Sequence, residues 1–299
     1  MMNETKIRAW EARSIDSLED REVVLSISGG KDSTAMALLF SQTNIRHRRV
    51  FIDTGWEHPS TKEYLLEYLQ PILGPIEVIS SPVGGMKDLV RKMNRFPSRG
   101  VRFCTGEIKL LPMRIYLEEQ PYEMVNAVGV RADESRRRAM YPEWEYSTSL
   151  RTEVWRPILT WKMEDVIDMH QRFQVRPNPL YLMGVKRVGC WPCIFSSRAE
   201  VRLLAEEDPH RIDEIRSLEE EINARRKEKD PEAKEVSWFS AGRESLPIDQ
   251  AVKWAFAKGS KEILLTGDKE AGCMRWGMCS PIHPLKEHQQ SINAHRIIR

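Results

Sequence analysis

The chain has 299 residues, 41% of them hydrophobic, which is enough for one α/β domain of ordinary size and a smaller appendage. Its 46 lysines and arginines nearly balance 44 aspartates and glutamates, and the formal charge of +2 excludes a strong overall field that would attract a polyanion. No apolar run approaches the roughly 20 residues that span a bilayer, and the N-terminus lacks the basic-then-apolar order of a signal peptide. We therefore expect a cytoplasmic protein with no membrane partner.

Apolar runs and turn residues alternate over the first 130 residues. Short runs rich in β-branched residues predict strands, and segments with helical spacing follow the first two of them. We expect strands at residues 22–27, 48–53, 76–79 and 123–130, and helices at residues 34–40 and 61–69. This alternation predicts an α/β fold with a parallel, doubly wound sheet, whose ligand site lies outside the carboxyl ends of the strands.

The pattern changes near residue 199, where the alternation of strands and helices stops. Residues 198–229 form a long, charged segment with a helical pattern, and residues 248–258 indicate another helix. We expect the charged residues of 210–229 to form a solvated helix face. The sequence therefore predicts a nucleotide-binding catalytic domain at residues 1–198 and a helical, loop-rich C-terminal extension at residues 199–299.

A glycine turn, Ser28-Gly29-Gly30-Lys31-Asp32-Ser33, connects the first expected strand to the first expected helix. A glycine pair at this point exposes backbone N–H groups, and the helix N-terminus adds a partial positive charge, so the turn is suited to bind an anion. The alternative is a turn that only connects two elements. The residues do not form a Walker A loop, because the spacing and the Lys-Ser/Thr order are absent. We expect the Lys31 side chain to be largely exposed at the mouth of this turn.

The glycine turn closely resembles the signature of the PP-loop superfamily, also called the ATP-pyrophosphatases or adenine nucleotide alpha-hydrolases, which cleave ATP between the α- and β-phosphates. Further segments resemble one branch of it, the phosphoadenylyl-sulfate (PAPS) reductase family, including its iron–sulfur and DNA-phosphorothioation members. In chain order these segments are residues 51–60, 128–139, 155–166, 178–181 and 187–193. The resemblance covers residues 20–205, and its specificity comes from the fixed order of the motifs.

The resemblance implies where a nucleotide binds and which residues act on it. The phosphates would be held by Ser28, Gly29, Gly30, Lys31, Asp32 and Ser33. Asp53 and Arg131 would line the nucleotide site, and Lys31, Asp32 and Arg131 would be catalytic. The expected ligand is ATP with Mg²⁺, or a sulfonucleotide such as PAPS or adenosine 5′-phosphosulfate (APS).

Five cysteines is an odd number, which in a chain without an export signal favours reduced thiols. Two of them form Cys190-Trp-Pro-Cys193, a spacing at which two thiolates can bind one metal centre. Residues 103–112 resemble the segment in which iron–sulfur members of the family carry cysteine ahead of Lys-x-x-Pro, and the Cys-x-x-Cys falls where theirs does. The resemblance therefore implies Cys104, Cys190 and Cys193 as metal ligands.

A fourth metal ligand is not evident beside Cys104. Family members that reduce adenylyl sulfate carry an adjacent Cys-Cys pair there, whereas this chain has Thr105. We expect the fourth ligand to be Cys279, with Cys273 or a substrate sulfur as alternatives. A 4Fe–4S cluster is the preferred interpretation, and a zinc ion or unligated thiols are the alternatives, since four thiolates also suit zinc.

Two further groups of residues have simpler interpretations beside functional ones. The basic run 136–138 would either contact a substrate phosphate or nucleic-acid backbone, or be solvated. Three tryptophans within the motifs are expected to pack in the interior rather than to stack on a ligand: Trp155, Trp161 and Trp191.

Two enzymatic roles fit the resemblance. In the first, the protein adenylates an acceptor with ATP, releases pyrophosphate and installs sulfur supplied by a donor such as a cysteine desulfurase, with nucleic acid as one candidate acceptor. In the second, it reduces a sulfonucleotide through a thiolate on a mobile tail. The tail of this chain does not match the Glu-Cys-Gly-x-His of the reductases, which favours sulfur transfer. A third role, from another class, is a nucleotide-binding sensor or adaptor without turnover.

Overall fold

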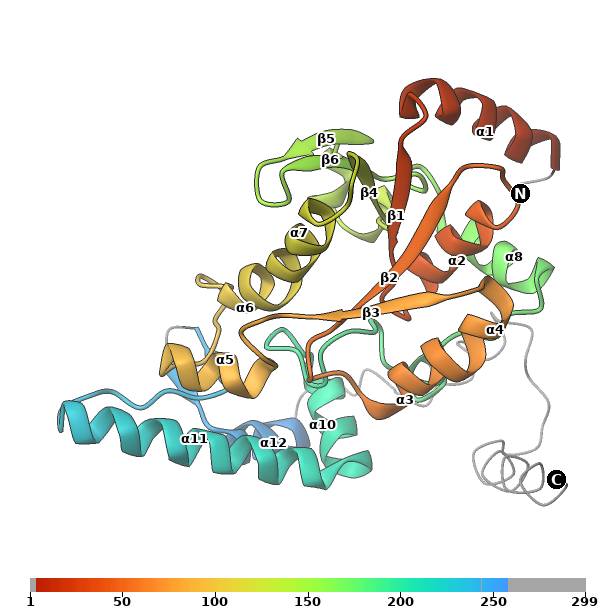
Figure 1. Ribbon diagram of the computed structural model, residues 1–299. Helices are drawn as coiled ribbons and strands as arrows, with labels where there is room; N and C mark the ends of the chain where they lie inside the picture. Colours follow the sequence, from red (N-terminus) through yellow and green to blue (C-terminus); the bar gives the residue numbers. More distant parts are fainter. Residues whose placement is uncertain (1–3, 243, 258–299) are drawn as a thin grey trace, which may run out of the picture.

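The computed structural model describes residues 4–242 and 244–257, and a six-stranded sheet lies at its centre (Figure 1). The strand order is β3-β2-β1-β4-β6-β5; β5 runs antiparallel to β6, and the other neighbours are parallel. The strands are β1 (Glu22–Ser26), β2 (His47–Asp53), β3 (Ile76–Ser80), β4 (Met124–Val128), β5 (Trp144–Ser147) and β6 (Thr152–Trp155). The chain moves from β1 to β2 on one side and later to β4 on the other. The switch point of the sheet, where ligands bind in such folds, is therefore between the carboxyl ends of β1 and β4.

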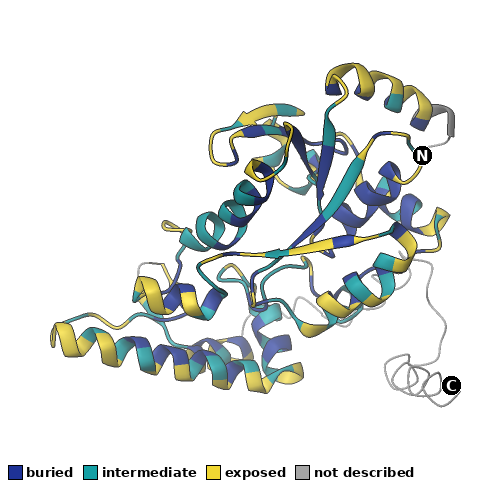
Figure 2. Ribbon diagram, viewed as in Figure 1, coloured by how far each residue is buried: buried dark blue, intermediate teal, exposed yellow. Residues whose placement is uncertain are grey.

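Helices cover both faces of the sheet. Val23 and Leu25 of β1 belong to the hydrophobic cluster that includes α2 (Lys31–Phe40) and α8 (Met163–Arg172), whereas Val24 packs in a cluster with α7 (Leu111–Glu118). Successive strand residues point to opposite faces, so an apolar strand such as β1 requires cover on both. The helix α2 is buried along its whole length (Figure 2).

The remaining elements before residue 198 are helices, most of them short. They are α1 (Glu4–Leu18), α3 (Pro59–Glu63), η1 (Tyr64–Leu69), α4 (Gln70–Leu73), α5 (Met86–Met93), α6 (Phe103–Thr105), η2 (Gly106–Leu110), η3 (Ala132–Glu134), η4 (Arg138–Met140) and α9 (Pro179–Leu182).

The C-terminal part contains α10 (Arg198–Glu207), α11 (Pro209–Lys229), the hairpin β7 (Phe239–Ala241) and β8 (Glu244–Leu246), and α12 (Ile248–Phe256). These elements lie beside α5 and share a second hydrophobic cluster with it (Figure 1). Trp56 and Leu180 also belong to this cluster. The division at residue 198 stays a prediction, and the second cluster draws side chains from both sides of it.

The structure confirms the predicted α/β class and the expected strands and helices of the first 130 residues. The motif residues 28–33, 53–58 and 129–138 lie at the carboxyl ends of β1, β2 and β4. The charged run also forms a solvated helix face: α11 buries one apolar row, Ile212, Ile215, Leu218 and Ile222, together with Glu219, and its other charged side chains are exposed or partly exposed (Figure 2). Trp155, Trp161 and Trp191 are buried, as expected for packing residues.

Two expectations about the C-terminal part were wrong in detail. Residues 198–229 form two helices instead of one, because Asp208 caps α11 by accepting a hydrogen bond from the Arg211 amide, and Pro209 starts the new helix. The extension also contains the β7–β8 hairpin, whereas only helices and loops were expected. The sequence patterns also did not indicate α1 or the β5–β6 pair. None of the helices in the described ranges is long and apolar enough to cross a membrane.

Candidate nucleotide and thiol site

The glycine turn between β1 and α2 is held by its own serine hydroxyls. The Ser28 amide donates to Ser33 Oγ at 3.1 Å, and Ser33 Oγ donates to the Gly30 carbonyl at 3.0 Å. Gly29 has a φ of +71°, a left-handed conformation that favours glycine. The turn is therefore shaped before any ligand binds, and it ends at the N-terminus of a helix of ten residues.

Gly129, at the carboxyl end of β4, explains why the turn and the next loop can lie so close together. A Cβ atom at this position would lie 2.7 Å from Ser33 Cα and 2.8 Å from the Ser33 amide nitrogen. Both contacts are with backbone atoms, which cannot move aside as a flexible side chain does. Glycine at this position therefore allows the loop carrying Arg131 to approach the start of α2.

The glycine turn is part of a network of buried ion pairs. Lys31 Nζ lies 3.1 Å from Asp32 Oδ2, and Arg131 Nε donates to Asp32 Oδ1 at 2.5 Å. The Arg131 guanidinium also pairs with Asp133 and is 1% exposed. Burial disfavours the charged guanidinium, but Asp32 and Asp133 outweigh this effect and raise the pKa of Arg131. The structure therefore brings together the three residues expected to be catalytic.

The expectation that Lys31 is largely exposed was wrong. The residue is 9% exposed, because its ammonium group is paired with Asp32 and lies 5.1 Å from the centre of the Tyr181 ring. The adjacent residue Asp32 and the distant residue Tyr181 together hold the amine over the turn. Its removal would consequently disturb the folded protein as well as a bound phosphate.

Tyr181 and His170 contact the backbone of the glycine turn, and the sequence analysis assigned neither a role. The Lys31 amide donates to the Tyr181 hydroxyl at 3.1 Å, and His170 Nε2 lies 2.9 Å from the Lys31 carbonyl oxygen. Burial lowers the pKa of His170 and raises the pKa of Tyr181. The helical spacing from the buried Val166 to His170 was a usable signal, since residues four apart share one helix face.

Asp53, expected to line the nucleotide site, ends β2 and has two local partners. Its carboxylate lies 2.5 Å from Lys62 Nζ and accepts a hydrogen bond from the Gly55 amide at 3.0 Å. Burial alone would raise the pKa of Asp53, but Lys62 and Gly55 lower it below its usual value. In this structure the carboxylate orders the turn after β2, and its contact with a nucleotide stays a prediction.

The loop Cys190–Cys193 packs on the turn that follows β2. The Trp191 amide donates to the Trp56 carbonyl at 2.7 Å, and Trp56 Nε1 donates to the Pro192 carbonyl at 3.2 Å. Cys190 also forms an isolated antiparallel bridge with Glu57. The second and the last motif of the sequence are therefore in direct contact, although more than a hundred residues separate them.

Three half-buried thiols, those of Cys104, Cys190 and Cys193, share one neighbourhood with Lys109. Burial raises the pKa of Cys104 and of Cys190, and the positive charge of Lys109 opposes this shift. The pKa of Lys109 is raised in turn, chiefly by Cys190. Burial outweighs the charge of Lys109, so the pKa values of Cys104 and Cys190 remain above the ordinary value and the lysine only limits the rise.

The described residues do not complete a metal site. Within residues 4–242 and 244–257, no group of three or more histidines, cysteines, aspartates or glutamates is close enough to hold a metal ion. The expected fourth ligand, Cys279, and its alternative, Cys273, lie outside the described residues. The thiols are the correct type of ligand for a 4Fe–4S cluster or for zinc, and both interpretations stay predictions.

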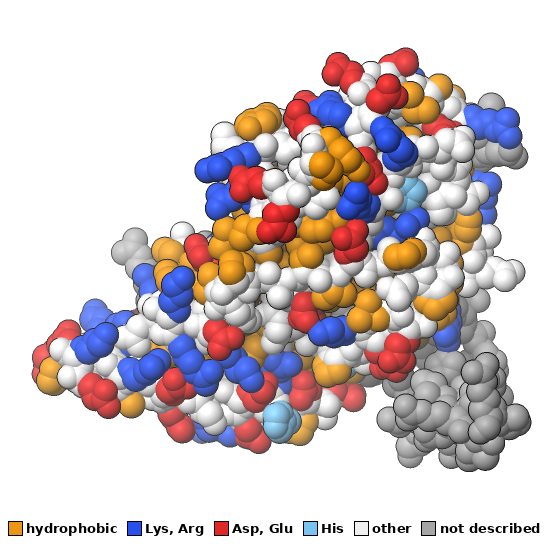
Figure 3. Space-filling model, viewed as in Figure 1, with side chains coloured by type: hydrophobic (Ala, Val, Ile, Leu, Met, Phe, Trp, Pro, Cys, Tyr) orange, Lys and Arg blue, Asp and Glu red, His pale blue; other side chains and the backbone are white. Residues whose placement is uncertain are grey.

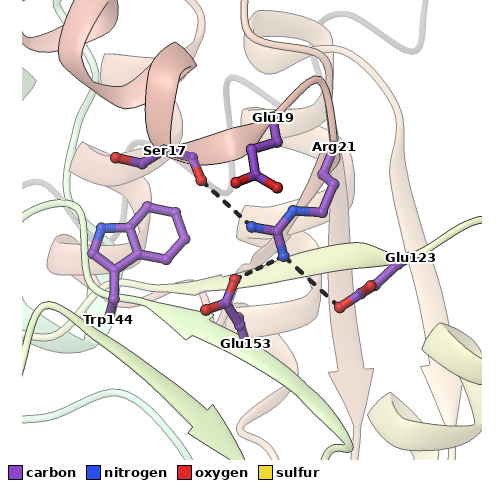
Figure 4. A pocket seen from close by; sticks show the side chains of 6 residues that line it. All are labelled: Ser17, Glu19, Arg21, Glu123, Trp144 and Glu153. Atoms are coloured by element: carbon purple, nitrogen blue, oxygen red, sulfur yellow. Dashed lines mark hydrogen bonds and ion pairs between the residues drawn. The ribbon is translucent and has the colours of Figure 1, made fainter.

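Two cavities lie beside α1, and the first of them is near the amino ends of β1 and β4. One, of about 460 Å³, is lined by Ser17, Glu19, Arg21, Glu123, Trp144 and Glu153. Figure 4 shows Arg21 at its centre, 2.7 Å from Glu153 and 3.8 Å from Glu123. The other, of about 680 Å³, shares Ser17 and Trp144 with the first. No residue of the expected nucleotide or thiol site lines either cavity. The ion pairs of Arg21, which precedes β1, connect it to Glu123 before β4 and to Glu153 in β6.

Comparison with known proteins agrees with the motifs. The sequence profile of the phosphoadenosine phosphosulfate reductase domain matches residues 22–196. A 37.8 kDa protein of Escherichia phage 186 is 31% identical over 252 residues, which cover 67% of this chain and 75% of the phage protein. The adenosine 5′-phosphosulfate reductase of Deinococcus radiodurans is 27% identical over 156 residues, covering 52% of this chain and 59% of the reductase.

Among solved structures, the phosphoadenylyl-sulfate reductase of Candida auris, in a phosphate complex, has a TM-score of 0.47 and 16% identity, covering 64% of this chain and 97% of that one. The domain profile spans more than half of the present chain and includes the glycine turn, the loop of Arg131 and the loop Cys190–Cys193. The chain therefore belongs to the phosphoadenosine phosphosulfate reductase domain family, a nucleotide-binding branch of the PP-loop superfamily.

Proposed function

We propose that this protein is an enzyme that binds ATP with Mg²⁺ at the glycine turn and cleaves it between the α- and β-phosphates to adenylate an acceptor for sulfur transfer. The observation that carries the proposal is the network of buried ion pairs at the N-terminus of α2, which is formed by Lys31, Asp32 and Arg131. Buried charges are costly to retain in a fold unless they are paired. Lys31 and Arg131, held by Asp32 and Asp133, lie beside a preformed anion-binding turn, and such a turn at a helix N-terminus suits the phosphates of ATP.

Each residue of the turn has a distinct role in this proposal. The backbone N–H groups and the hydroxyls of Ser28 and Ser33 hold phosphate oxygens, and Lys31 stabilises the negative charge that develops on the leaving pyrophosphate. Asp32 orients both cations, because its two carboxylate oxygens contact Lys31 and Arg131 separately. We infer that Arg131, which Asp32 and Asp133 hold beside the start of α2, neutralises charge at the α-phosphate.

The reaction requires two displacements. An oxygen atom of the acceptor attacks the α-phosphorus of ATP, the bond to the bridging oxygen breaks, and pyrophosphate leaves with Mg²⁺. A sulfur nucleophile, supplied by a donor such as a cysteine desulfurase, then displaces AMP from the adenylated acceptor. No net oxidation or reduction occurs if the donor delivers hydrosulfide, and a persulfide donor needs a thiol to reduce it.

The thiols supply the sulfur-handling part of the proposal. Cys104, Cys190 and Cys193 surround Lys109 on the same side of the sheet as the glycine turn, since Cys190 contacts the turn that follows β2. We infer that they hold a 4Fe–4S cluster together with Cys279 or Cys273, with zinc as the alternative. Iron and sulfide analysis of anaerobically purified protein tests this part, and a preparation with zinc or without metal would remove the cluster.

A second candidate function is sulfonucleotide reduction. The specific observation in its favour is the similarity to relatives named adenosine 5′-phosphosulfate reductase. A nucleotide-binding sensor or adaptor without turnover is the third candidate. It is disfavoured because Lys31, Asp32 and Arg131 are all present and mutually paired.

One set of assays separates the three functions. Purified protein is incubated with Mg²⁺ and labelled ATP, alone and with candidate acceptors, and pyrophosphate and AMP are measured; parallel reactions contain APS or PAPS with a thiol reductant. Acceptor-dependent pyrophosphate release supports the proposal. Sulfite release from a sulfonucleotide without consumption of ATP would replace it by the reductase function. If ATP binds but neither pyrophosphate nor sulfite is produced, the result supports the sensor function.

A further inference from the structure

The exposed surface beside the thiols carries two arginines and an aromatic ring. The guanidinium carbons of Arg99 and Arg102 lie 5.8 and 5.3 Å from the centre of the Phe195 ring, which belongs to a residue that is 44% exposed. Arg102 also donates to Thr105 Oγ1, next to Cys104. Phe195 follows Cys193 by two residues. This surface therefore adjoins the thiols in space and along the chain.

The segment 186–195 connects this surface to the glycine turn. Val188 lies against Gly30, where a Cβ atom would be 3.9 Å from the valine Cβ. Lys186 and Arg187, just before it, are exposed. The segment then passes through Cys190 and Cys193 to Phe195. We call Arg99, Arg102, Lys186, Arg187 and Phe195 the thiol-side surface: Lys186 and Arg187 precede the thiols along the chain, and Phe195, whose ring lies against Arg99 and Arg102, follows them.

The cations of the thiol-side surface differ from those of α11. Around α11, Lys227 pairs with Glu235 and Arg216 with Asp249, each at 2.8 Å, and blue and red side chains alternate over this helix in Figure 3. By contrast, no carboxylate of the described residues forms an ion pair with the four cations of the thiol-side surface. Paired charges cancel at a distance, whereas unpaired cations attract a polyanion.

We propose that the thiol-side surface binds a single strand of nucleic acid and brings one nucleotide to the thiols. This inference rests on the proposed sulfur transfer and names its acceptor class. Arginines track the phosphates of a single strand, and an exposed aromatic ring between them stacks a base. An acidic protein would neutralise the cations, but it would offer the exposed ring of Phe195 no base to stack on.

The C-terminal segment, which the proposed function brings to the thiols through Cys279 or Cys273, does not complement the cations of the thiol-side surface. Residues 258–299 contain seven lysines and arginines against four aspartates and glutamates. A segment with this composition is itself basic and does not complement a cationic surface. The charge of the surface therefore favours a separate, polyanionic partner.

The test measures binding of a fluorescently labelled, mixed-sequence single-stranded oligonucleotide by anisotropy over a series of salt concentrations. The double variant Arg99→Ala/Arg102→Ala should bind at least about tenfold more weakly. The slope of log K against log salt concentration should also become less steep by about 1.4, because each lost phosphate contact on a single strand contributes about 0.7. Phe195→Leu, which keeps an apolar side chain without the ring, should weaken binding about tenfold through lost stacking. The matched control, Arg216→Ala/Lys227→Ala, removes two exposed but paired cations and should bind like the wild type.

The inference would be overturned if the wild type did not bind the oligonucleotide at low salt, or if the Arg99/Arg102 variant bound it as tightly as the control does. It would also be overturned if poly-glutamate competed as strongly as unlabelled oligonucleotide and Phe195→Leu had no effect on binding. The last result would indicate an acidic protein. ATP-dependent pyrophosphate release is measured on the same preparations. Release without oligonucleotide binding refutes only this inference, whereas oligonucleotide binding without ATP cleavage refutes only the proposed function.

Discussion

The glycine turn and the loop Cys190–Cys193 lie at the same edge of the sheet, but they are built differently. At the turn, the cations Lys31 and Arg131 are paired with the carboxylates of Asp32 and Asp133, and the backbone is held by serine hydroxyls. Around the loop, a lysine is surrounded by three thiols, and the adjoining surface cations have no carboxylate partner within the described residues. The comparison indicates that the turn is shaped by its own contacts, whereas the thiol side carries cations that no carboxylate of the described residues balances.

The largest expected effect is at Arg131. The variant Arg131→Leu should lower the free energy of unfolding by about 3–5 kcal/mol, because it leaves the buried carboxylate of Asp32 with Lys31 as its one remaining cation. Chemical denaturation of wild type and variant measures the loss. Arg138→Leu, at a partly exposed pair with Glu134, is the control and should cost about 1 kcal/mol or less. An equal loss of unfolding free energy in the two variants would show that the buried ion pairs of Arg131 contribute no more to stability than a partly exposed pair does.

Lys31→Ala should reduce the rate of pyrophosphate release about a hundred- to thousandfold, because it removes a preorganised charge from the leaving group. Since Lys31 is buried and paired, unfolding should also become easier, by about 1–2 kcal/mol. Single-turnover assays beside melting curves separate the two effects. Lys87→Ala removes an exposed amine paired with Glu214 and serves as control. A Lys31→Ala variant with the wild-type rate would refute the assignment of the turn as a catalytic phosphate site.

Gly129→Ala introduces a methyl group within 2.7 Å of the Ser33 backbone. The overpacking should destabilise the protein by about 1–3 kcal/mol and displace the loop of Arg131 from the start of α2. Nucleotide affinity and melting temperature should both fall. Gly189→Ala, where an added Cβ meets nothing within 4 Å, is the matched control. Unchanged nucleotide affinity in Gly129→Ala would show that the close approach is not needed for binding.

Tyr181→Phe should cost about 1 kcal/mol of stability, the typical contribution of one hydrogen bond. The Tyr181 hydroxyl occupies the Lys31 amide, a donor in the first turn of α2 that would otherwise be available to a phosphate. Removing the hydroxyl should therefore raise the affinity for pyrophosphate up to about tenfold, measured by calorimetry. A lower affinity would instead mean that the hydroxyl itself contacts the ligand. Tyr64→Phe, which loses a hydrogen bond to Arg176, controls for the loss of stability alone.

Asp53→Asn has the smallest expected effect. The folded protein lowers the pKa of Asp53, so the carboxylate stabilises the fold above its ordinary pKa, and this contribution disappears as the pH falls through the lowered value. The variant should therefore be less stable by about 0.2–1 kcal/mol at pH 7 and equal to the wild type near pH 2. Denaturation at both pH values measures this difference. If ATP affinity also falls more than tenfold, Asp53 lines the nucleotide site as the family resemblance implies.

The sequence by itself determined the α/β class, the order of the first four strands and the position of the glycine turn. These features follow from local patterns: an apolar β-branched run such as residues 22–27 forms a strand, and a glycine pair between a strand and a helix forms a turn. The motifs also identified the family. Lys31, Asp32 and Arg131 were selected as site residues before their contacts were known, and the structure brings all three together.

Only the tertiary structure decided how these residues are used. The burial of Lys31 depends on Tyr181, 150 positions away, and the packing of Cys190 on Glu57 joins segments that share no sequence pattern. The clearance at Gly129 depends on the distance between two backbones. Local patterns carry no information about such contacts, because they arise when separate elements pack and each side chain acquires neighbours from distant parts of the chain.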